Sequence, residues 1–151
     1  MAAYNFVSHW HIAATAQAAE EALLRNEDWV RWWPGLASVD TLSGGVGTGA
    51  RYACVWKSGV GYSLKLVVTI TEFTPGKSVT FTAEGDLVGE GSFTLDHTDE
   101  ISTDIVIRWN ADATKPWMKL TAPLFRPLFV SLHYRLMRAG EQGFNRYVSG
   151  E

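Results

Sequence analysis

The last third of the chain predicts one long amphipathic helix, and this helix limits what the rest of the chain can form. Apolar residues recur there at intervals of three and four, the spacing that lines one face of a helix: Phe125, Phe129, Leu132, Leu136, Gly140 and Phe144. Pro123 and Pro127 disfavour helix in the residue before each of them, so residues 118–122 are expected to form a separate turn. The continuous helix is then expected from about Pro123 to Tyr147, and another layer must cover its apolar face.

The only other layer that the sequence offers is a β-sheet. Residues 4–13 alternate as in a strand, with one side formed by Tyr4, Phe6, Ser8, Trp10 and Ile12. Two short helices are expected at 16–25 and 28–33. Six further strands, separated by short turns, are expected at 36–42, 49–57, 61–73, 78–83, 87–97 and 101–111. Short connections predict an antiparallel meander, so the fold class is α+β, with a space for a ligand between the sheet and the final helix.

Length and composition indicate a single domain, 1–151, that is large enough to bury its own core. Cys54 is the only cysteine, and the chain shows neither a signal-peptide pattern nor an apolar run of about 20 residues. We therefore expect a cytoplasmic protein without a membrane span.

The charged residues are unevenly distributed along the chain. Residues 1–114 contain 7 Lys and Arg against 14 Asp and Glu, whereas residues 115–151 contain 6 Lys and Arg against 2 Asp and Glu. This asymmetry favours docking of a basic helix on an acidic sheet over nucleic-acid binding.

Four segments carry a resemblance to a known superfamily. They are Trp29-Val30-Arg31-Trp32-Trp33-Pro34-Gly35-Leu36, Gly49-Ala50-Arg51-Tyr52, Gly85-Asp86-Leu87-Val88-Gly89-Glu90-Gly91, and Lys115-Pro116-Trp117-Met118 with Ala122-Pro123-Leu124. Over essentially its whole length the chain resembles the START-like, or SRPBCC, superfamily, and within it the bacterial polyketide cyclase/dehydrase-like group. The resemblance implies the helix-grip fold, in which a seven-stranded curved antiparallel sheet grips the last helix around an apolar cavity. It implies no single chemistry, because the superfamily contains lipid carriers, hormone receptors and cyclases.

Side chains expected on the inner face of the sheet would form the wall of such a cavity. They are Tyr52, Trp56, Tyr62, Leu64, Leu66, Val68, Phe81, Phe93, Ile105, Ile107 and Trp109. Their rings and polar tips suit a flat apolar ligand with an oxygen atom or two, although the same rings also suit an ordinary filled core. Gly89 and Gly91 lie on the same side and predict either a strand bend or real room. Within the tryptophan segment, Trp29 and Trp33 are expected to pack together into the domain near the final helix, leaving Trp32 more exposed at the cavity mouth.

His133 is the best polar candidate, because it lies near the edge of the buried face of the final helix, four residues after Phe129. An imidazole there can act as a general base or form a hydrogen bond with a ligand carbonyl. The alternative is a partly buried structural histidine, since no Asp or Glu lies nearby on the helix to orient it. The complete predicted ligand-binding set is Trp32, Tyr52, Trp56, Tyr62, Phe81, Phe93, Trp109 and His133.

Two histidines of the first strand raise the question of a metal. His9 and His11 share one strand face, and Asp104 or Asp40 would have to supply a third ligand. Alternation places both histidines on the solvent side, opposite Trp10. We therefore expect a surface charge cluster there, and neither a metal nor a cofactor.

Nucleophile and phosphate-binding patterns are weak. Cys54 aligns with inward-facing Tyr52 and Trp56 and lacks an adjacent base, so it is expected to be buried and unreactive. The glycine-rich segment 44–49 lies between strands without a following helix or a Lys-Ser/Thr pair. It is expected to form a mobile loop at the cavity mouth.

Three functions follow from this reading. The first is binding or carriage of a small apolar ligand, aromatic, polyketide-like or lipidic. The second is a cyclase/dehydrase-type enzyme in which His133, Tyr62 and Arg51 fold a reactive chain and remove a proton. The third is a protein-interaction module that uses the basic final helix or the tryptophan segment. Two or more ionisable side chains that converge in the cavity would favour the enzyme, and a homodimer is compatible with all three.

Overall fold

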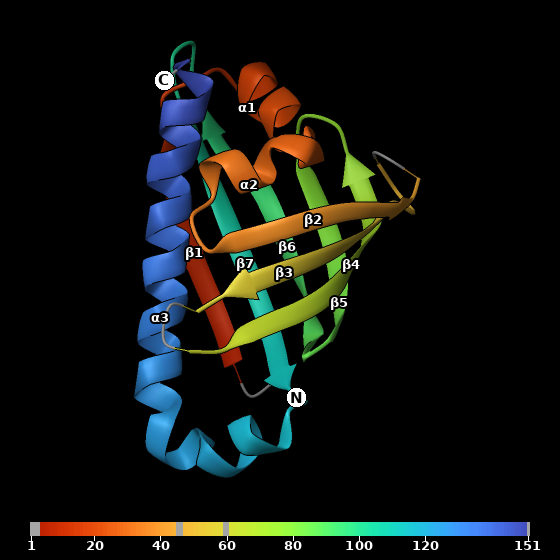
Figure 1. Ribbon diagram of the computed structural model, residues 1–151. Helices are drawn as coiled ribbons and strands as arrows, with labels where there is room; N and C mark the ends of the chain where they lie inside the picture. Colours follow the sequence, from red (N-terminus) through yellow and green to blue (C-terminus); the bar gives the residue numbers. More distant parts are fainter. Residues whose placement is uncertain (1–3, 45–46, 59–60, 151) are drawn as a thin grey trace.

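The computed structural model describes residues 4–44, 47–58 and 61–150, and it has the predicted α+β, helix-grip architecture (Figure 1). Its elements in chain order are β1 Tyr4–Ile12, α1 Ala16–Leu23, the 3₁₀ turn η1 Asn26–Asp28, α2 Trp29–Trp32, β2 Leu36–Ser43, β3 Arg51–Lys57, β4 Ser63–Thr74, β5 Ser78–Gly85, β6 Leu87–Thr98, β7 Thr103–Ala113 and α3 Pro116–Val148. Every predicted strand and helix is present. Only the start of the final helix differs from its predicted position by more than two residues.

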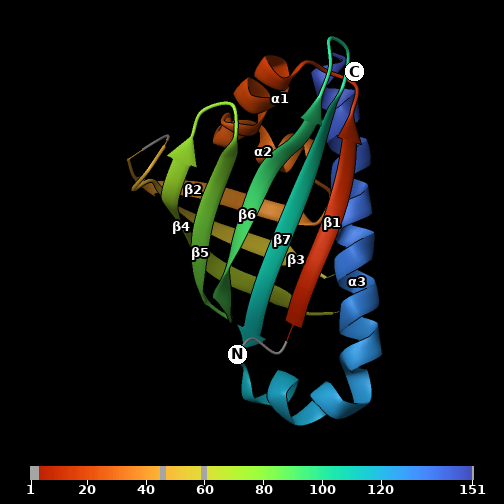
Figure 2. The same ribbon diagram turned by 180° about the vertical axis from the view of Figure 1, so that it is seen from behind.

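The seven strands form one antiparallel sheet in the order β1-β7-β6-β5-β4-β3-β2. Strands β2 to β7 follow one another as a meander, and the first strand of the chain pairs with the last. Register shifts interrupt the β2/β3, β4/β5 and β6/β7 ladders, and such irregularities bend strands and increase their twist. Figures 1 and 2 show the result, in which β2 and β3 cross over β6 and β7 with the interior between them.

Two glycines of β6 allow a close approach to β7. A Cβ atom at Gly89 would overlap the carbonyl oxygen of Asn110, and one at Gly91 would lie 2.7 Å from the carbonyl oxygen of Arg108. Neither position has space for a side chain. These glycines therefore allow close packing of β6 on β7 rather than added room for a ligand, which was one of the two alternatives that the sequence left open.

The final helix, α3, is continuous from Pro116, so the predicted separate turn at residues 118–122 is wrong. Pro123 and Pro127 both lie inside it, and Figure 1 shows its first turns below the sheet and the long remainder running upward along the sheet. Each proline lacks an N–H and pushes against the preceding turn, which bends the helix without ending it. Neither α3 nor any other described helix is long and apolar enough to cross a membrane.

The buried face of α3 differs in part from the predicted one. Three of the six predicted residues are buried, namely Phe129, Gly140 and Phe144. Leu132 and Leu136 are only half-buried, Phe125 is exposed, and Met137 is buried instead. The bend before Phe129 changes the direction of the helix axis, so residues on either side of it cannot share one face.

Hydrogen bonds fasten α3 along β1, the edge strand of the sheet. Glu141 accepts a hydrogen bond from the backbone N–H of His11 (2.7 Å). Asn145 accepts one from the N–H of Ala13 (2.8 Å) and donates one to the carbonyl of His11 (3.0 Å). These side chains satisfy polar groups of an edge strand that could otherwise pair with another chain.

The short helices cover the upper end of the interior. Glu20 of α1 accepts a hydrogen bond from the N–H of Gly76 in the β4–β5 turn (2.5 Å). Asn26 of η1 donates one to the hydroxyl of Thr41 on β2 (2.8 Å). These contacts tie the helical segment to strands that are distant in the sheet, as Figure 1 shows from the position of α1 and α2 above β2.

Trp32 is the most buried tryptophan of its segment, so the prediction that it is exposed at the cavity mouth is wrong. It is 4% exposed, and its ring lies 4.7 Å from that of Phe144. The cause is Gly143 of α3, where a side chain would overlap the backbone carbonyl of Trp32. Because α2 has only four residues, this contact with a distant helix decides which way its side chains point.

We expect Gly143→Ala to destabilise the protein. Helix propensity alone would favour alanine by about 1 kcal/mol. The added methyl group, however, would overlap a backbone atom of α2 that cannot move alone. The free energy of unfolding in urea should fall by about 1–3 kcal/mol. Gln142→Ala at the exposed neighbouring position should change it by less than about 0.5 kcal/mol. Equal values for both variants would contradict the close contact at Gly143.

Candidate ligand-binding site

Strand pairing brings the predicted lining residues into rows across the inner face of the sheet. In one row, Phe6 of β1 pairs with Trp109 of β7, Trp109 with Gly91 of β6, and Gly91 with Phe81 of β5. The next row consists of Ser8, Ile107, Phe93 and Val79. Because Gly91 has no side chain, the rings of Phe81 and Trp109 stack across it with their centroids 5.9 Å apart.

Many of these inward side chains are not fully buried. The half-buried ones are Trp56, Tyr62, Leu64, Val68, Phe81, Phe93 and Trp109, whereas Tyr52, Leu66, Ile105 and Ile107 are buried. The buried apolar residues form three separate clusters, around Trp10, around Phe6 and around Tyr52. One continuous core would bury the side chains that lie between these clusters. Solvent therefore reaches part of the inner face.

On β3, the predicted residues Tyr52 and Trp56 meet the tryptophan segment. The rings of Tyr52 and Trp29 are 5.2 Å apart, and those of Trp56 and Trp33 are 5.0 Å apart. The indole N–H of Trp33 donates a hydrogen bond to the carbonyl of Leu136 on α3 (3.1 Å). Trp33 therefore connects β3 to the final helix at the interior, a position that the sequence-based set did not include.

At the lower end of the interior, three aromatic residues hold the bent start of α3 in place. Tyr62 lies 5.2 Å from Trp117 and 6.3 Å from Phe129, measured between ring centroids. Trp117 and Phe129 are themselves 6.3 Å apart. These contacts join the first turn of α3, its long part and the start of β4, and they set the lower limit of the inner face. Burial raises the pKa of Tyr62, so its hydroxyl is protonated at neutral pH.

His133 lies at the contact between α3 and β1. Its ring stacks on that of Phe6 with the centroids 3.8 Å apart, and its Nε2 atom is buried with no hydrogen-bond partner among the described residues. Burial lowers the pKa of His133 to about 4, so the imidazole is neutral at pH 7. Such a weak base is poorly matched to proton abstraction at neutral pH. It can still form a hydrogen bond with a ligand.

Two more buried polar atoms on β1 were missed by the sequence-based set. Ser8 Oγ and Trp10 Nε1 have no hydrogen-bond partner in the described part of the chain. Both alternate with Phe6 on the inner side of β1, and Trp10 reaches α3 at Gly140. Ser8 therefore faces the stretch of α3 between His133 and Gly140. The available signal was a serine in a row of large apolar residues.

Arg51, proposed above as a catalytic group, does not face the interior. It is exposed and alternates with buried Tyr52 along β3, so its predicted role is wrong.

Cys54 is buried as expected, and burial raises the pKa of its thiol to about 11. A thiol of this kind is unreactive at neutral pH. Residues 45 and 46 of the predicted mobile loop lie outside the described residues.

The outer face of β1 carries a hydrogen-bonded charge pair. His11 Nδ1 lies 2.6 Å from the carboxylate of Asp104, and this hydrogen bond raises the pKa of His11. His9 is exposed on the same face, while Asp40 belongs to β2 at the opposite edge of the sheet. Within residues 4–44, 47–58 and 61–150 no cluster of three potential metal ligands occurs.

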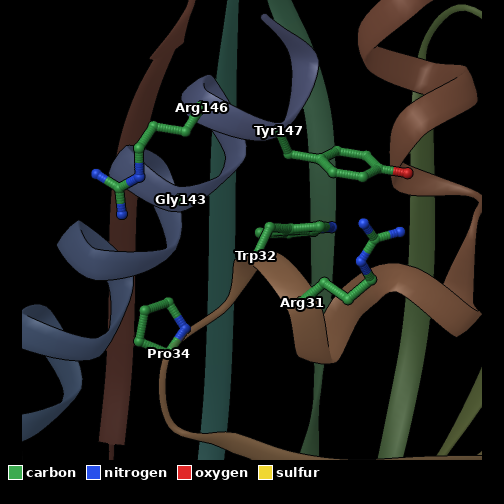
Figure 3. Close-up of a pocket in the computed structure, with 6 residues that line it drawn as sticks. All are labelled: Arg31, Trp32, Pro34, Gly143, Arg146 and Tyr147. Atoms are coloured by element: carbon green, nitrogen blue, oxygen red, sulfur yellow. The ribbon is translucent and has the colours of Figure 1, made fainter. Parts of the chain in front are cut away.

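Two hollows lie outside the interior. One, of about 160 Å³, is lined by Arg31, Trp32, Pro34, Gly143, Arg146 and Tyr147 (Figure 3). Figure 3 shows Trp32 between Arg31 and Tyr147, with Arg146 pointing away from them. Asp28 already accepts hydrogen bonds from Arg31 (3.4 Å) and Tyr147 (2.5 Å), so the polar side of this hollow is largely paired. The other, of about 470 Å³, lies over β5, β6 and β7.

A curved antiparallel sheet that holds a long C-terminal helix at its edge defines the helix-grip class of the START/SRPBCC superfamily, which the sequence resembles. The chain belongs to a particular family within it. The model of the family described as polyketide cyclase/dehydrase and lipid transport matches residues 5–148. Among curated protein sequences, none shows significant similarity to this chain.

Solved structures confirm the fold. The chain is similar to the protein TTHA0849 from Thermus thermophilus, with a TM-score of 0.83, 18% identity, and coverage of 96% of this chain and 97% of that one. It is similar to the Zhui aromatase/cyclase from Streptomyces sp. R1128, with a TM-score of 0.78, 14% identity and coverage of 97% and 93%. It is also similar to a START superfamily protein from Mycobacterium smegmatis, with a TM-score of 0.76, 13% identity and coverage of 96% and 97%. At these identities the likeness shows the fold alone.

We expect His133 to make stability depend on pH. Between pH 6.5 and about 4, the imidazole binds a proton in the unfolded chain and resists one in the folded chain, so the protein loses stability as the pH falls. The loss from this group is up to about 3 kcal/mol and is absent above pH 6.5. Urea unfolding of wild type and His133→Leu at pH 7, 5.5 and 4 measures it, and the variant should show the smaller loss. His9→Gln, which removes an exposed imidazole, is the control. Parallel profiles for wild type and His133→Leu would contradict burial of the ring.

Proposed function

We propose that this protein binds a small, ring-containing apolar ligand between the inner face of the sheet and α3. The observation that carries the proposal is a set of inward aromatic rings that are only half-buried, above all Phe81, Phe93 and Trp109. Apolar surface that a fold turns inward but does not cover is what an apolar ligand can cover. The family description, which includes lipid transport, supports the same class of ligand. The cytoplasmic location inferred from the sequence remains part of this proposal.

The polar atoms beside α3 define what else the ligand needs. Trp10 Nε1 can only donate a hydrogen bond, Ser8 Oγ can donate or accept, and neutral His133 can do either according to its tautomer. A ligand oxygen, such as that of a phenol or a ketone, can accept from a donor of this group. Leaving buried donors unpaired is costly, and their pairing would therefore contribute to affinity for oxygen-bearing ligands.

Binding or carriage accounts for the interior better than catalysis. Among the described residues the ionisable groups on the inner face are His133, Cys54 and three tyrosines, Tyr4, Tyr52 and Tyr62. Burial weakens His133 as a base and keeps Tyr52, Tyr62 and Cys54 protonated. No pair of groups with pKa values near 7 is present there to exchange a proton. Cyclisation remains the second candidate, supported by the family description and by the likeness to an aromatase/cyclase.

We expect Trp109→Ala to weaken the binding of flat aromatic compounds. The change removes both wall area and the ring that stacks on Phe81. Titration of an environment-sensitive naphthalene dye, followed by fluorescence, should show saturable binding to wild type and a dissociation constant about tenfold higher for the variant, equivalent to ~1.4 kcal/mol. Val88→Ala, on the outer face of β6, is the matched control and should bind as wild type does. Absence of saturable binding to wild type would contradict the proposed ligand-binding function.

A second pair of measurements tests the oxygen-binding group. We expect wild type to prefer 2-naphthol over naphthalene, and Ser8→Ala to lose part of that preference, because one hydroxyl partner is gone. The expected loss is about threefold to tenfold in relative affinity, since one neutral hydrogen bond contributes about 1 kcal/mol. An unchanged preference would place the ligand away from Ser8. A rate of cyclisation with a polyketide-like substrate, absent in His133→Leu, would instead support the enzyme.

A further inference from the structure

The first turns of α3 expose large apolar side chains to solvent. Leu120 is 82% exposed and Leu124 is 74% exposed, and they are joined by Trp117 and Leu128, which are about two fifths exposed. We call these four residues the outer apolar strip. Leu120, Leu124 and Leu128 follow one another at intervals of four, the spacing of neighbouring positions on a helix surface. The domain leaves Leu120 and Leu124 uncovered. Met118 and Phe129, at other positions around α3, are buried against the domain, and Trp117 contacts Tyr62 with one side of its ring while two fifths of the residue stays exposed.

The part of the chain that carries this strip has charged side chains of one sign. Residues 113–140 contain no Asp or Glu and five cationic residues, namely Lys115, Lys119, Arg126, Arg135 and Arg138. Lys115 lies 3.6 Å from the carboxylate of Asp86, and Arg126 lies over the ring of Tyr4. Lys119, Arg135 and Arg138 are exposed. The rest of the chain is net acidic, so the cations are concentrated at the helix that carries the strip.

We propose that the outer apolar strip docks this protein on the surface of an anionic phospholipid bilayer. An exposed helical face with leucines and a tryptophan, flanked by lysine and arginine, has the two features that peripheral attachment requires. The leucines enter the boundary between headgroups and acyl chains, Trp117 lies at the interface, and the cations meet the lipid phosphates. The association needs no membrane span and does not depend on whether the interior binds a ligand.

A second copy of this chain fits the same strip less well. A two-fold symmetric contact through it would bring Lys119 and Arg135 of one copy towards the same cations of the other. A contact with the acidic outer face of another copy would be of the head-to-tail kind, which forms chains of molecules unless its rotation closes a ring. Anionic lipid satisfies both the apolar and the cationic part of the surface at once.

Docking in this orientation would bring the lower end of the interior close to the lipid. Trp117 of the strip is also in contact with Tyr62, which limits the inner face at that end. Tyr62 and Phe129 thus lie directly behind the surface that meets the bilayer. A ligand of the class proposed above could pass between the membrane and the interior along this short route, although the docking itself stands without it.

Vesicle binding of the full chain tests the docking. Wild type should co-sediment with vesicles that contain phosphatidylglycerol and phosphatidylcholine, and much less with vesicles of phosphatidylcholine alone. Leu120→Ser with Leu124→Ser should lower the partition coefficient at least tenfold, because most of the inserted aliphatic area is removed. The matched control replaces two exposed aliphatic residues elsewhere, Leu42→Ser with Ile101→Ser, and should bind as wild type does. Raising the salt from about 0.1 M to about 1 M, which shortens the Debye length from about 10 Å to about 3 Å, should also reduce binding.

The other outcomes each overturn the proposal. One is absence of wild-type binding to anionic vesicles, and another is an equal loss in the Leu42/Ile101 variant. Light scattering that shows a dimer which the Leu120/Leu124 variant abolishes would assign the strip to self-association. Because both leucines are exposed, the variant should keep its circular dichroism spectrum and its uptake of the naphthalene dye. Normal dye uptake with lost vesicle binding separates failure of docking from failure of the ligand site.

Discussion

The contact between α3 and β1 decides where the interior of this protein lies. Glu141 and Asn145 fix the upper part of the helix to the backbone of an edge strand, and Trp10 packs against Gly140 at the same level. A helix held at the edge covers the inner side chains of β1 fully, and it leaves several of the large rings further across the sheet only half-buried. That difference is visible in the exposure of individual residues. Ile105 and Ile107 are buried, whereas Phe81 and Phe93, further from the helix, are only half-buried.

The same contact leaves buried polar atoms without hydrogen-bond partners among the described residues, and such atoms lower the stability of the fold. Ser8 Oγ, Trp10 Nε1 and His133 Nε2 are buried and unpaired among the described residues, at a typical cost of about 1–3 kcal/mol for each such group. A core selected for stability alone would replace them with apolar residues of similar shape. Their presence between β1 and α3 is therefore more consistent with a site than with simple packing. Stacking of His133 on Phe6 holds the imidazole in one orientation, as a binding group requires.

Local patterns predicted most of the fold, because strand alternation, turn residues and helical spacing act over a few positions. They could not predict the direction of the tryptophan segment. Trp32 is buried by a contact with Gly143, more than a hundred residues away, and a four-residue helix has no apolar periodicity of its own to reveal this. The enzyme hypothesis placed Arg51 in the interior, although alternation with Tyr52 turns it outward. For the proposed site, the aromatic wall residues followed from strand alternation, whereas the choice of Ser8 and Trp10 required knowledge of where the helix lies.

The bend in α3 connects the interior of the protein to its surface. A straight helix that continued the buried face of Phe129 and Phe144 towards its N-terminus would run past the end of the sheet with little to bury. Pro123 and Pro127 instead turn its first part below the strands, where Met118 and Trp117 return to Tyr4 and Tyr62. That turn gives the segment an inner side that packs on the domain and an outer side that does not. Leu120 and Leu124 are exposed for the same reason that the interior has a lower boundary, so one distortion of the backbone produces both features.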